Sequence, residues 1–576
     1  MRAHWLLPEH DPASVRELAG VLGVHPLTAR VLLSRGLANP DDANRFLRPA
    51  LNDLHDPYRM AGMREAVGRV RQAIEKREPV LIYGDYDVDG TTSVVILKKA
   101  IELAGGSASF HVPHRLREGY GMRTEVIERA AADGVRLVIS VDTGIRAQEV
   151  VRAAQGLGID VIVTDHHLPE SELPPALAVL NPNRPDCGYP EKNLCGAGVT
   201  FKLVQALLAT LDWTPGRLQN MLRSFLKLVA IATVADVVPL LGENRVIVKH
   251  GLEGMVKVNN PGLRALMEVS RLFDGGAPTA REIAFQIAPR INAAGRMAHA
   301  EDVIHLFLTD DLEHARKLAG QLHALNQDRQ QTEAEIVKAI LEECVKTPVS
   351  DSQAALVFSA AGWHRGVVGI VASRLVERFC RPVFVLSEED GEAQGSGRSI
   401  PAFHLLEALE SMRELFTRFG GHRQAAGLGM NLDRVEEFRA RLNGYAGARL
   451  TPADFRPQIS IDAVTSFKEL YEGAAEEMLS LAPFGFGNPS PTLATMDAEI
   501  CGPPSVLKEK HLRVRFRQNE RTLVATAWNF AERLEECQHG CKTSLAFCLE
   551  EDSYSQDRGG QSWRAMLKDI RPAPTQ

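Results

Sequence analysis

Acidic and imidazole side chains follow several short apolar stretches of this 576-residue sequence. The stretches 79–84, 135–140, 160–164 and 228–235 are followed closely by Asp85, Asp87 and Asp89, by Asp142, by Asp165, His166 and His167, and by Asp236. If the first three stretches are strands of one parallel sheet, their carboxyl ends meet at one edge, and ligands gather outside that edge. The spacing therefore predicts a cluster of carboxylates and imidazoles.

Such a cluster would be costly without cations, because neighbouring carboxylates raise one another's pKa and destabilise the fold. Divalent ions remove this cost, and carboxylates with neutral imidazoles suit Mn²⁺ or Mg²⁺. Two such ions about 4 Å apart activate a water molecule and stabilise an in-line displacement at phosphorus. The residue types thus predict metal-dependent hydrolysis of a phosphoester.

Each motif alone has a simpler interpretation. The run from Asp85 to Gly90 could be a polar turn or a calcium-type loop, and Asp142 could cap a helix. His166 or His167 could be an ordinary surface histidine. The same placement at three successive strand ends is what favours the metal site.

The surrounding pattern supplies the elements that would position these side chains. Strand-like runs, including a fourth at 176–181, alternate with helical stretches, which is typical of a parallel sheet. A polar stretch at 310–345, with apolar residues every three or four positions, predicts a long connecting helix. A second strand, helix and strand then follow, up to about residue 450.

The tail from about residue 455 has short alternating segments, which predict a small β-barrel. The expected fold class is α/β, with a parallel-sheet domain and a smaller α/β domain joined by a long helix, plus the C-terminal barrel. The expected divisions are an N-terminal helical segment at 1–50, the parallel-sheet domain at 51–270, a connecting segment with the long helix at 271–345, the smaller α/β domain at 346–450 and the barrel at 451–576.

The composition indicates a globular protein without membrane-spanning helices. Hydrophobic residues make up 45 % and charged residues 24 %, as in ordinary globular proteins. The longest apolar run, 228–235, is far shorter than the ~20 residues of a membrane helix, and the eight cysteines form no CxxC pair. We expect a cytoplasmic protein that has no contact with membranes. A net charge of −7 means that any nucleic-acid binding must depend on local basic groups.

One such group lies in the tail. Arg513, Arg515 and Arg517 alternate with apolar residues, so a strand here would bury one face and expose a row of positive charges. Small barrels bind single strands with such basic faces, and aromatic residues stack on the bases. Trp528 and Phe530 could stack in this way or could belong to the core.

The ordered set of motifs resembles the DHH phosphoesterase family, and within it the exonucleases specific for single-stranded DNA. The resemblance extends through most of the chain, and no motif position departs from the pattern. Its motifs here are YGDYDVDGTTS at 83–93, VDTG at 141–144, DHH at 165–167, ADVVPL at 235–240, APRINAAGRM at 288–297, GWHRGVVGIVASRL at 362–375, GSGRS at 395–399 and GGH at 420–422.

The resemblance implies a site with two divalent metal ions, Mn²⁺ or Mg²⁺. It implies that Asp87 and Asp89 bind different ions and that Asp142 bridges them. His166 and Asp236 complete the shell of the second ion, and Asp85 belongs to the same set of ligands. His167 faces the scissile phosphate, so the catalytic residues are His167, Asp142 and Asp87.

The resemblance also implies a DHH-associated domain that closes over the substrate and an OB-fold at the C-terminus. Arginines are candidates for phosphate contacts because their planar fork binds two oxygens, and adjacent glycines let the backbone approach a phosphate. The phosphate- and DNA-binding candidates are Arg290, Asn292, Arg296, Ser396, Arg398, Gly420, Gly421, His422, Arg513, Arg515 and Arg517.

The function implied by the resemblance is 5′→3′ degradation of single-stranded DNA to mononucleotides in DNA repair and recombination. A helicase and a single-strand-binding protein are the implied partners, and we expect a monomer. A phosphoesterase for short oligonucleotides or cyclic dinucleotides would not need the ~120-residue tail. A non-catalytic scaffold would be expected to have lost some of the acidic residues, yet all are present.

Overall fold

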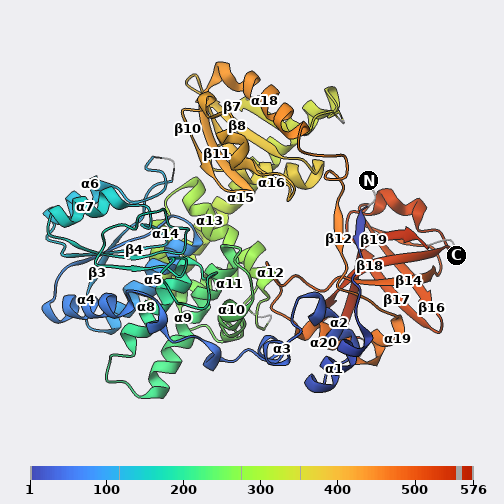
Figure 1. The fold of residues 1–576 in the computed structure, drawn as a ribbon, viewed down its shortest axis with the longest axis horizontal. Helices are drawn as coiled ribbons and strands as arrows, with labels where there is room; N and C mark the ends of the chain where they lie inside the picture. Colours follow the sequence, from blue (N-terminus) through green and yellow to red (C-terminus); the bar gives the residue numbers. More distant parts are fainter. Residues whose placement is uncertain (1–2, 116, 274–275, 351, 553–560, 574–576) are drawn as a thin grey trace.

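The computed structural model describes residues 1–576 except 1–2, 116, 274–275, 351, 553–560 and 574–576. Figure 1 shows two α/β units side by side and a β-rich unit at the other end of the molecule. Each unit has its own buried apolar cluster. None of the helices in the described part of the chain is long and apolar enough to cross a membrane.

The first unit contains a five-stranded sheet in the order β3-β2-β4-β5-β6, and every neighbouring pair is parallel. The prediction of a parallel sheet is therefore confirmed. Buried β-branched residues are frequent in the three central strands β2, β4 and β5, as expected of a sheet that is covered on both faces. The strands are β2 (Val80–Tyr83), β3 (Ala108–His111), β4 (Leu137–Val141), β5 (Asp160–Thr164) and β6 (Ala178–Leu180).

Helices cover both faces of this sheet (Figure 1). Val80 and Ile82 point into one apolar cluster, and Leu81 and Tyr83 point into the other. The first face packs against α4 (Met63–Lys76), α5 (Val88–Leu103), α8 (Gly196–Leu208) and α9 (Pro215–Ala235), and the second against α6 (Thr124–Ala132) and α7 (Gln148–Gly156).

The predicted long helix is α15 (Leu312–Lys346), which connects the two α/β units. Its first turns pack into the core of the first unit through Leu318 and Leu322. Ile336 and Ile340 pack into the second unit. The same core of the first unit includes α10 (Gly242–Gly254), α11 (Pro261–Val269), α13 (Ala288–Met297) and α14 (Glu301–Leu308).

The second α/β unit has a five-stranded sheet in the order β10-β11-β9-β8-β7. Only β7 and β8 are parallel, and the other neighbours are antiparallel. The strand, helix and strand at the start of this unit agree with the pattern of the sequence, whereas its antiparallel strands were not predicted. The elements are β7 (Leu356–Ala361), α16 (Val368–Phe379), β8 (Val383–Glu389), β9 (Glu392–Arg398), α17 (Leu405–Glu410), β10 (Arg418–Gly421), β11 (Ala425–Asn431) and α18 (Val435–Gly447).

The C-terminal unit confirms the predicted small barrel. Its strands follow the order β13-β14-β18-β19-β17-β16-β15, and an additional pairing of β14 with β16 closes the ring. The strands are β13 (Ala463–Val464), β14 (Leu493–Ile500), β15 (Ser505–Leu507), β16 (His511–Gln518), β17 (Arg521–Ala527), β18 (Lys542–Glu551) and β19 (Trp563–Pro572).

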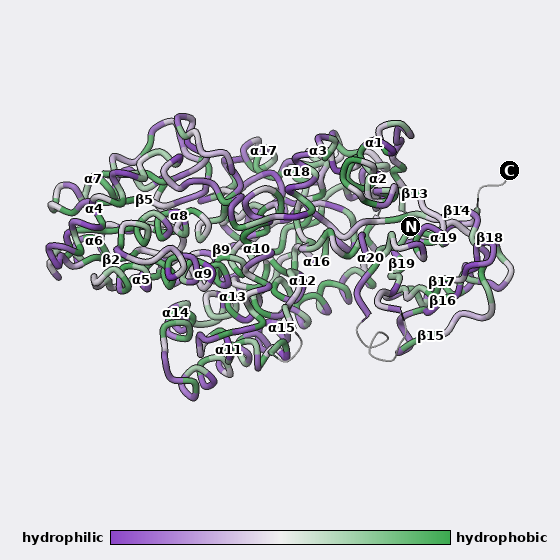
Figure 2. The backbone as a smooth tube through the Cα atoms, turned by 90° about the horizontal axis from the view of Figure 1, so that it is seen from below, coloured by the Kyte–Doolittle hydropathy of each residue, from purple (hydrophilic) through white to green (hydrophobic). Residues whose placement is uncertain are grey.

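The N-terminal segment packs on this barrel, as Figures 1 and 2 both show. Its helices are α1 (Pro12–Leu22), α2 (Pro26–Ser34) and α3 (Pro40–Leu47). Leu27, Leu32 and Phe46 share one apolar cluster with barrel residues such as Phe516. The segment also contains a strand, β1 (His4–Leu6), which pairs in parallel with β12 (Gln458–Ser460).

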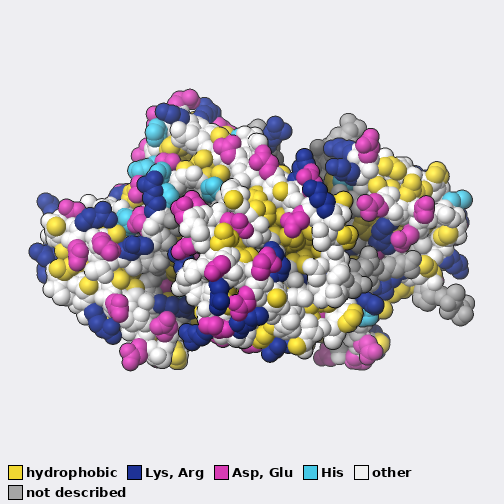
Figure 3. Space-filling view, turned by 90° about the horizontal axis from the view of Figure 1, so that it is seen from above, with side chains coloured by type: hydrophobic (Ala, Val, Ile, Leu, Met, Phe, Trp, Pro, Cys, Tyr) yellow, Lys and Arg dark blue, Asp and Glu magenta, His cyan; other side chains and the backbone are white. Residues whose placement is uncertain are grey.

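Charges of both signs are interspersed on the face seen from above (Figure 3). This distribution agrees with the modest net charge of −7. Binding of a polyanion would therefore depend on particular side chains rather than on the whole surface.

Candidate metal centre and phosphate site

The acidic residues that follow separate strands and helices lie together at the carboxyl edge of the first sheet. The candidate ligand atoms of Asp85, Asp87 and Asp142 all lie within 4.8 Å of one another. The same holds for Asp89, His166 and Asp236, and for Asp142, His166 and His167. The structure therefore brings together all six metal ligands that were expected from the sequence.

Helix N-termini hold two of these carboxylates. Asp87 caps α5 by accepting the N–H of Gly90 (3.0 Å). The helix therefore begins at Val88, inside the motif. Asp89 accepts the N–H groups of Gly196 (2.6 Å) and Ala197 (2.7 Å) at the start of α8. Both carboxylates are thus fixed by the positive end of a helix.

Asp142 occupies the centre of the cluster. Its φ of 59° lies in the left-handed region that residues other than glycine rarely adopt. A Cβ at Gly196 would lie only 2.6 Å from the Asp142 carboxylate, so this position requires glycine. The close approach leaves Asp142 3 % exposed, with its carboxylate directed at the other acids.

The acidic cluster has the properties of a metal-binding site. Burial, followed by repulsion from neighbouring carboxylates, raises the pKa of Asp85, Asp142 and Asp236 well above the usual range. Among the described residues, one carboxylate oxygen of each is buried without a hydrogen-bond partner. Divalent cations would satisfy these oxygens and restore the charged form, so the residues fit the Mn²⁺ or Mg²⁺ pair that was expected.

His166 supplies the imidazole of the cluster. Its Nε2 lies 3.3 Å from Asp142 Oδ1, 3.7 Å from Asp236 Oδ2 and 3.9 Å from Asp89 Oδ2. Burial lowers the pKa of His166 in spite of these acids, so the ring is neutral. A neutral imidazole is the form that binds a metal ion.

Asp165 orients the neighbouring His167, a role that the sequence analysis missed. The Asp165 carboxylate is fully buried and accepts the Ile145, His166 and His167 N–H groups and His167 Nδ1 (2.7 Å). Burial alone would raise the pKa of Asp165, but these hydrogen bonds lower it. Burial likewise opposes the charge on His167, yet the contact with Asp165 raises the pKa of His167. With Nδ1 occupied, Nε2 is the nitrogen that is left for a substrate.

A group of arginines lies beside the acidic cluster. Arg398 Nη1 donates to Ser396 Oγ (2.7 Å), and Arg296 Nη1 donates to the Gly366 carbonyl (2.9 Å). Burial, together with the nearby charges of Arg115 and Arg398, lowers the pKa of Arg296 to about 10. In the part of the chain that the structure describes, neither Arg296 nor Arg398 forms an ion pair with a carboxylate. Two half-buried guanidinium groups side by side would suit an anion such as a phosphate.

Arg115 is the member of this group that the sequence analysis missed. Its guanidinium carbon lies 4.8 Å from the centre of the Tyr86 ring, inside the acidic motif. It opposes the raised pKa of Asp85 and adds to the repulsion at Arg398. Arg115 lies in the loop after β3, a strand that was not among those predicted from the sequence.

The two polar candidates on α13 have different positions. Asn292 belongs to the site, because its Oδ1 accepts the Val88 N–H (3.3 Å) at the start of α5. Arg290 points elsewhere: its Nε donates to His323 of α15 (3.2 Å). The structure therefore does not place Arg290 with the other phosphate candidates.

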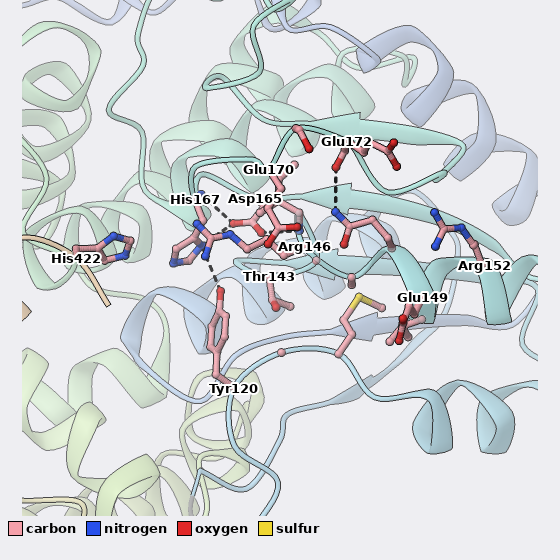
Figure 4. Close-up of a pocket in the computed structure, with 18 residues that line it drawn as sticks. Tyr120, Thr143, Arg146, Glu149, Arg152, Asp165, His167, Glu170, Glu172 and His422 are labelled. Carbon is pink, nitrogen blue, oxygen red and sulfur yellow. Dashed lines mark hydrogen bonds and ion pairs between the residues drawn. The ribbon is translucent and has the colours of Figure 1, made fainter. Parts of the chain in front are cut away.

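The second α/β unit contributes His422 to the same site. A cavity of about 880 Å³ is lined by Tyr120, Asp165 and His167 of the first unit and by His422. Figure 4 shows His422 reaching this cavity from a separate segment, next to His167. Gly421 has a φ of 146°, and a Cβ there would lie 2.4 Å from the Ala425 carbonyl, whereas a Cβ at Gly420 would meet nothing. Gly421 therefore permits the tight turn that presents His422.

The barrel arginines lie far along the chain and have the predicted alternation. In β16, Leu512, Val514 and Phe516 are fully buried. Arg513, Arg515 and Arg517 point outward, and Arg517 pairs with Glu499 (3.0 Å). Nearby Trp528 is 54 % exposed, and its ring lies 4.3 Å from that of His511.

Comparisons with known proteins agree with this arrangement. Residues 79–233 match the DHH family N-terminal domain, residues 352–448 match the DHHA1 domain and residues 461–569 match the RecJ OB domain. The single-stranded-DNA-specific exonuclease RecJ of Bacillus subtilis is 37 % identical over 99 % of this chain and 71 % of its own length. The protein with the same description from Escherichia coli is 37 % identical over 95 % of this chain and 96 % of its own.

A solved structure has the same architecture. The crystal structure of RecJ in complex with Mn²⁺ from Thermus thermophilus superposes with a TM-score of 0.84 at 32 % identity. The match covers 100 % of this chain and 80 % of that chain. The chain therefore belongs to the RecJ family of DHH proteins.

Proposed function

We propose that this protein is a metal-dependent exonuclease that degrades single-stranded DNA in the 5′→3′ direction and releases mononucleotides. The observation that carries the proposal is the position of the arginine group beside the acidic cluster. The arginines would hold a terminal 5′ phosphate, and the next phosphate along the strand would then lie at the acidic cluster. Cleavage at that phosphate releases one nucleotide.

The acidic cluster would hold two divalent ions. Asp85, Asp87 and Asp142 would bind one, and Asp89, His166 and Asp236 the other, with Asp142 between them. Such ions supply a water nucleophile and stabilise charge on the reacting phosphate when bound.

The protein's own groups orient the substrate around this centre. His167, held by Asp165, would donate a hydrogen bond or a proton to the scissile phosphate through Nε2. His422 would contact the same phosphate from the opposite side of the cavity. The terminal phosphate would bind between Arg115, Arg296 and Arg398, with Ser396 fixing the Arg398 fork.

A time course with end-labelled single-stranded DNA tests the reaction and its polarity. One substrate carries the label at the 5′ end and the other at the 3′ end, with Mn²⁺, Mg²⁺ or a chelator. We expect immediate release of labelled mononucleotide from the 5′ label only, and none with the chelator. Release from the 3′ label first, or cleavage of dinucleotides alone, would contradict the proposal.

The preference for single strands follows from the position of the cavity between two α/β units. A duplex end would have to separate before one strand could reach the arginine group. We expect a blunt duplex to be degraded at a small fraction of the single-strand rate. Equal initial rates on the two substrates would show that this cavity does not select single strands.

The wider setting is part of the same proposal. A role in DNA repair and recombination and contacts with a helicase and a single-strand-binding protein follow from the family resemblance. A cytoplasmic location is expected from the apolar runs and cysteines of the sequence, and a monomeric state from its length and its single set of motifs. The domain divisions at 50, 270, 345 and 450 also stay predictions. Sedimentation of the purified protein checks the monomeric state directly.

A further inference from the structure

The metal ligand Asp236 is joined to the C-terminal barrel through a short connection. Asp236 is the first residue after α9, and its N–H still bonds to the Ala232 carbonyl (2.9 Å). Val237 follows with a φ of 58°, which a β-branched residue rarely adopts. Such a conformation persists only when the surrounding contacts impose it.

The residues that follow Val237 pack against the turn at residues 485–488, which precedes strand β14 of the barrel. The Leu240 N–H donates to the Phe486 carbonyl (2.8 Å), and Leu240 is 1 % exposed. A Cβ at Gly487 would lie 2.8 Å from the Pro239 Cβ, and one at Gly485 would lie 2.7 Å from Leu240. The backbone of this turn is therefore packed directly on the connection that follows Asp236.

The turn itself is held rigidly. Gly485 and Asn488 exchange backbone hydrogen bonds (2.9 and 3.2 Å). The buried Asn488 side chain donates to the Leu481 and Pro483 carbonyls (3.0 and 2.8 Å) and accepts from Arg35, which directly follows α2. The turn cannot shift without breaking these bonds.

A second anchor lies beside it. Arg245 of α10 is 1 % exposed and donates to the Leu481 (3.0 Å), Ala482 (2.9 Å) and Phe46 (2.7 Å) carbonyls. Helix α10 begins two residues after Leu240. The barrel and the N-terminal helices are thus fastened to the first unit on the chain segment that carries Asp236.

We propose that the turn at 485–488 is a positioning element of the metal centre: it fixes the Asp236 connection and thereby sets the affinity of the ion bound by Asp89, His166 and Asp236. The inference rests on the proposed function only in assuming that the acidic cluster binds divalent ions. It gives the barrel a second role besides contact with DNA, because its attachment to the first unit would tune the catalytic centre.

The test is a Mn²⁺ titration of the full-length protein, in which free Mn²⁺ is quantified by electron paramagnetic resonance. Gly487→Ala places a methyl group against Pro239 and should weaken one of two Mn²⁺ sites about tenfold. Gly502→Ala is the matched control, since Gly502 has a similar φ (79° against 73°) in the same unit but a Cβ there meets nothing. It should bind Mn²⁺ like the wild type.

Two further measurements separate this effect from general damage. Binding of fluorescent single-stranded DNA with a chelator present should be unchanged in Gly487→Ala. If that variant does not fold, the Mn²⁺ titration is made with Gly485→Ala instead, because the added Cβ would displace only the Leu240 side chain. Wild-type Mn²⁺ affinity in the folded glycine variants, or an equal loss in Gly502→Ala, would overturn the inference. A wild-type protein that binds Mn²⁺ but cleaves no DNA would refute the proposed function alone.

Discussion

The two groups of functional charges in this molecule are arranged in opposite ways. Asp85, Asp89 and Asp142 of the acidic cluster in the first unit are buried. Among the residues that the structure describes, three carboxylates of the cluster have an oxygen without a hydrogen-bond partner. The arginine row of β16 stands on the outer face of the barrel, in water, above a fully buried apolar row. One region concentrates charge where it is costly, and the other keeps charge where water solvates it.

The difference indicates that the acidic cluster serves catalysis and that the arginine row of β16 serves DNA binding. Buried carboxylates in fixed positions interact strongly with a cation because little water competes for them. Exposed arginines contribute mainly by displacing counterions from a nucleic acid, which makes their effect sensitive to salt. We therefore expect changes in the acidic cluster to affect turnover and changes in the barrel to affect binding.

The largest expected effect is that of Asp142→Ala. Asp142 lies within reach of both ligand groups, so its loss should lower turnover on 5′-labelled DNA by more than about 1000-fold, or about 4 kcal/mol. Single-strand binding should be nearly unchanged. Asp133→Ala, at an exposed position after α6, is the control. Full activity of Asp142→Ala at saturating Mn²⁺ would contradict the shared-ligand assignment.

The next effect concerns the arginine group. Arg296 and Arg290 lie on the same helix, but only Arg296 faces the site. Arg296→Gln should lower kcat/KM on 5′-phosphorylated DNA by roughly 10–100-fold, the value of a charge-assisted hydrogen bond. The loss should be much smaller on DNA with a 5′ hydroxyl. Arg290→Gln should leave kcat/KM unchanged on both substrates. Equal losses of kcat/KM in the two variants would show that Arg296 does not bind the terminal phosphate in a way that Arg290 does not.

A smaller effect is expected when the arginine row of β16 is changed. Replacing Arg513, Arg515 and Arg517 with alanine should weaken single-strand binding about tenfold at moderate salt. The slope of log K against log salt should fall by up to about 1.4, because Arg513 and Arg515 would each lose a phosphate contact worth about 0.7, whereas Arg517 is paired with Glu499. Turnover at saturating DNA should equal that of the wild type.

Arginines in and next to α18 provide a matched control for this triple variant. Each is partly exposed and pairs with a glutamate of its own unit, so its loss should not change the salt slope. The control residues are Arg434, Arg439 and Arg441. An unchanged slope in the β16 variant would mean that its arginines contact water rather than DNA.

The smallest effect is expected for Trp528→Ala. A stacked base contributes about 1–3 kcal/mol, so affinity should fall several-fold while the salt slope is unchanged. Fluorescence anisotropy at several salt concentrations measures both quantities. A change in slope without a change in affinity would mean that Trp528 acts only by positioning nearby charges.

Sequence patterns predicted those features that depend on local periodicity. The strands that end before Asp85, Asp142 and Asp165 were predicted because buried parallel strands are short apolar runs. The alternation in β16 was predicted because a strand exposes every second residue.

Features that depend on contacts between distant segments could not be predicted. Arg115 joins the phosphate site from a loop, and Arg290 faces away from it because of the rotation of α13. Asp165 orients His167 through hydrogen bonds from backbone N–H groups. Such groups are the same in almost every residue type, so a sequence does not show which of them will bind a carboxylate. Asp87 serves both as the cap of α5 and as a candidate ligand, and the motif alone does not show the first of these roles.

The packing of α1–α3 on the barrel has a consequence for synthesis. These helices are made first, but their apolar partners in the barrel begin about 415 residues later, near Ala463. At about 5–20 residues per second, the ribosome needs roughly 20–80 s to reach that point. Throughout that interval Leu27, Leu32 and Phe46 lack their final neighbours. A chain whose synthesis stops before the barrel therefore exposes an apolar surface that the barrel otherwise covers.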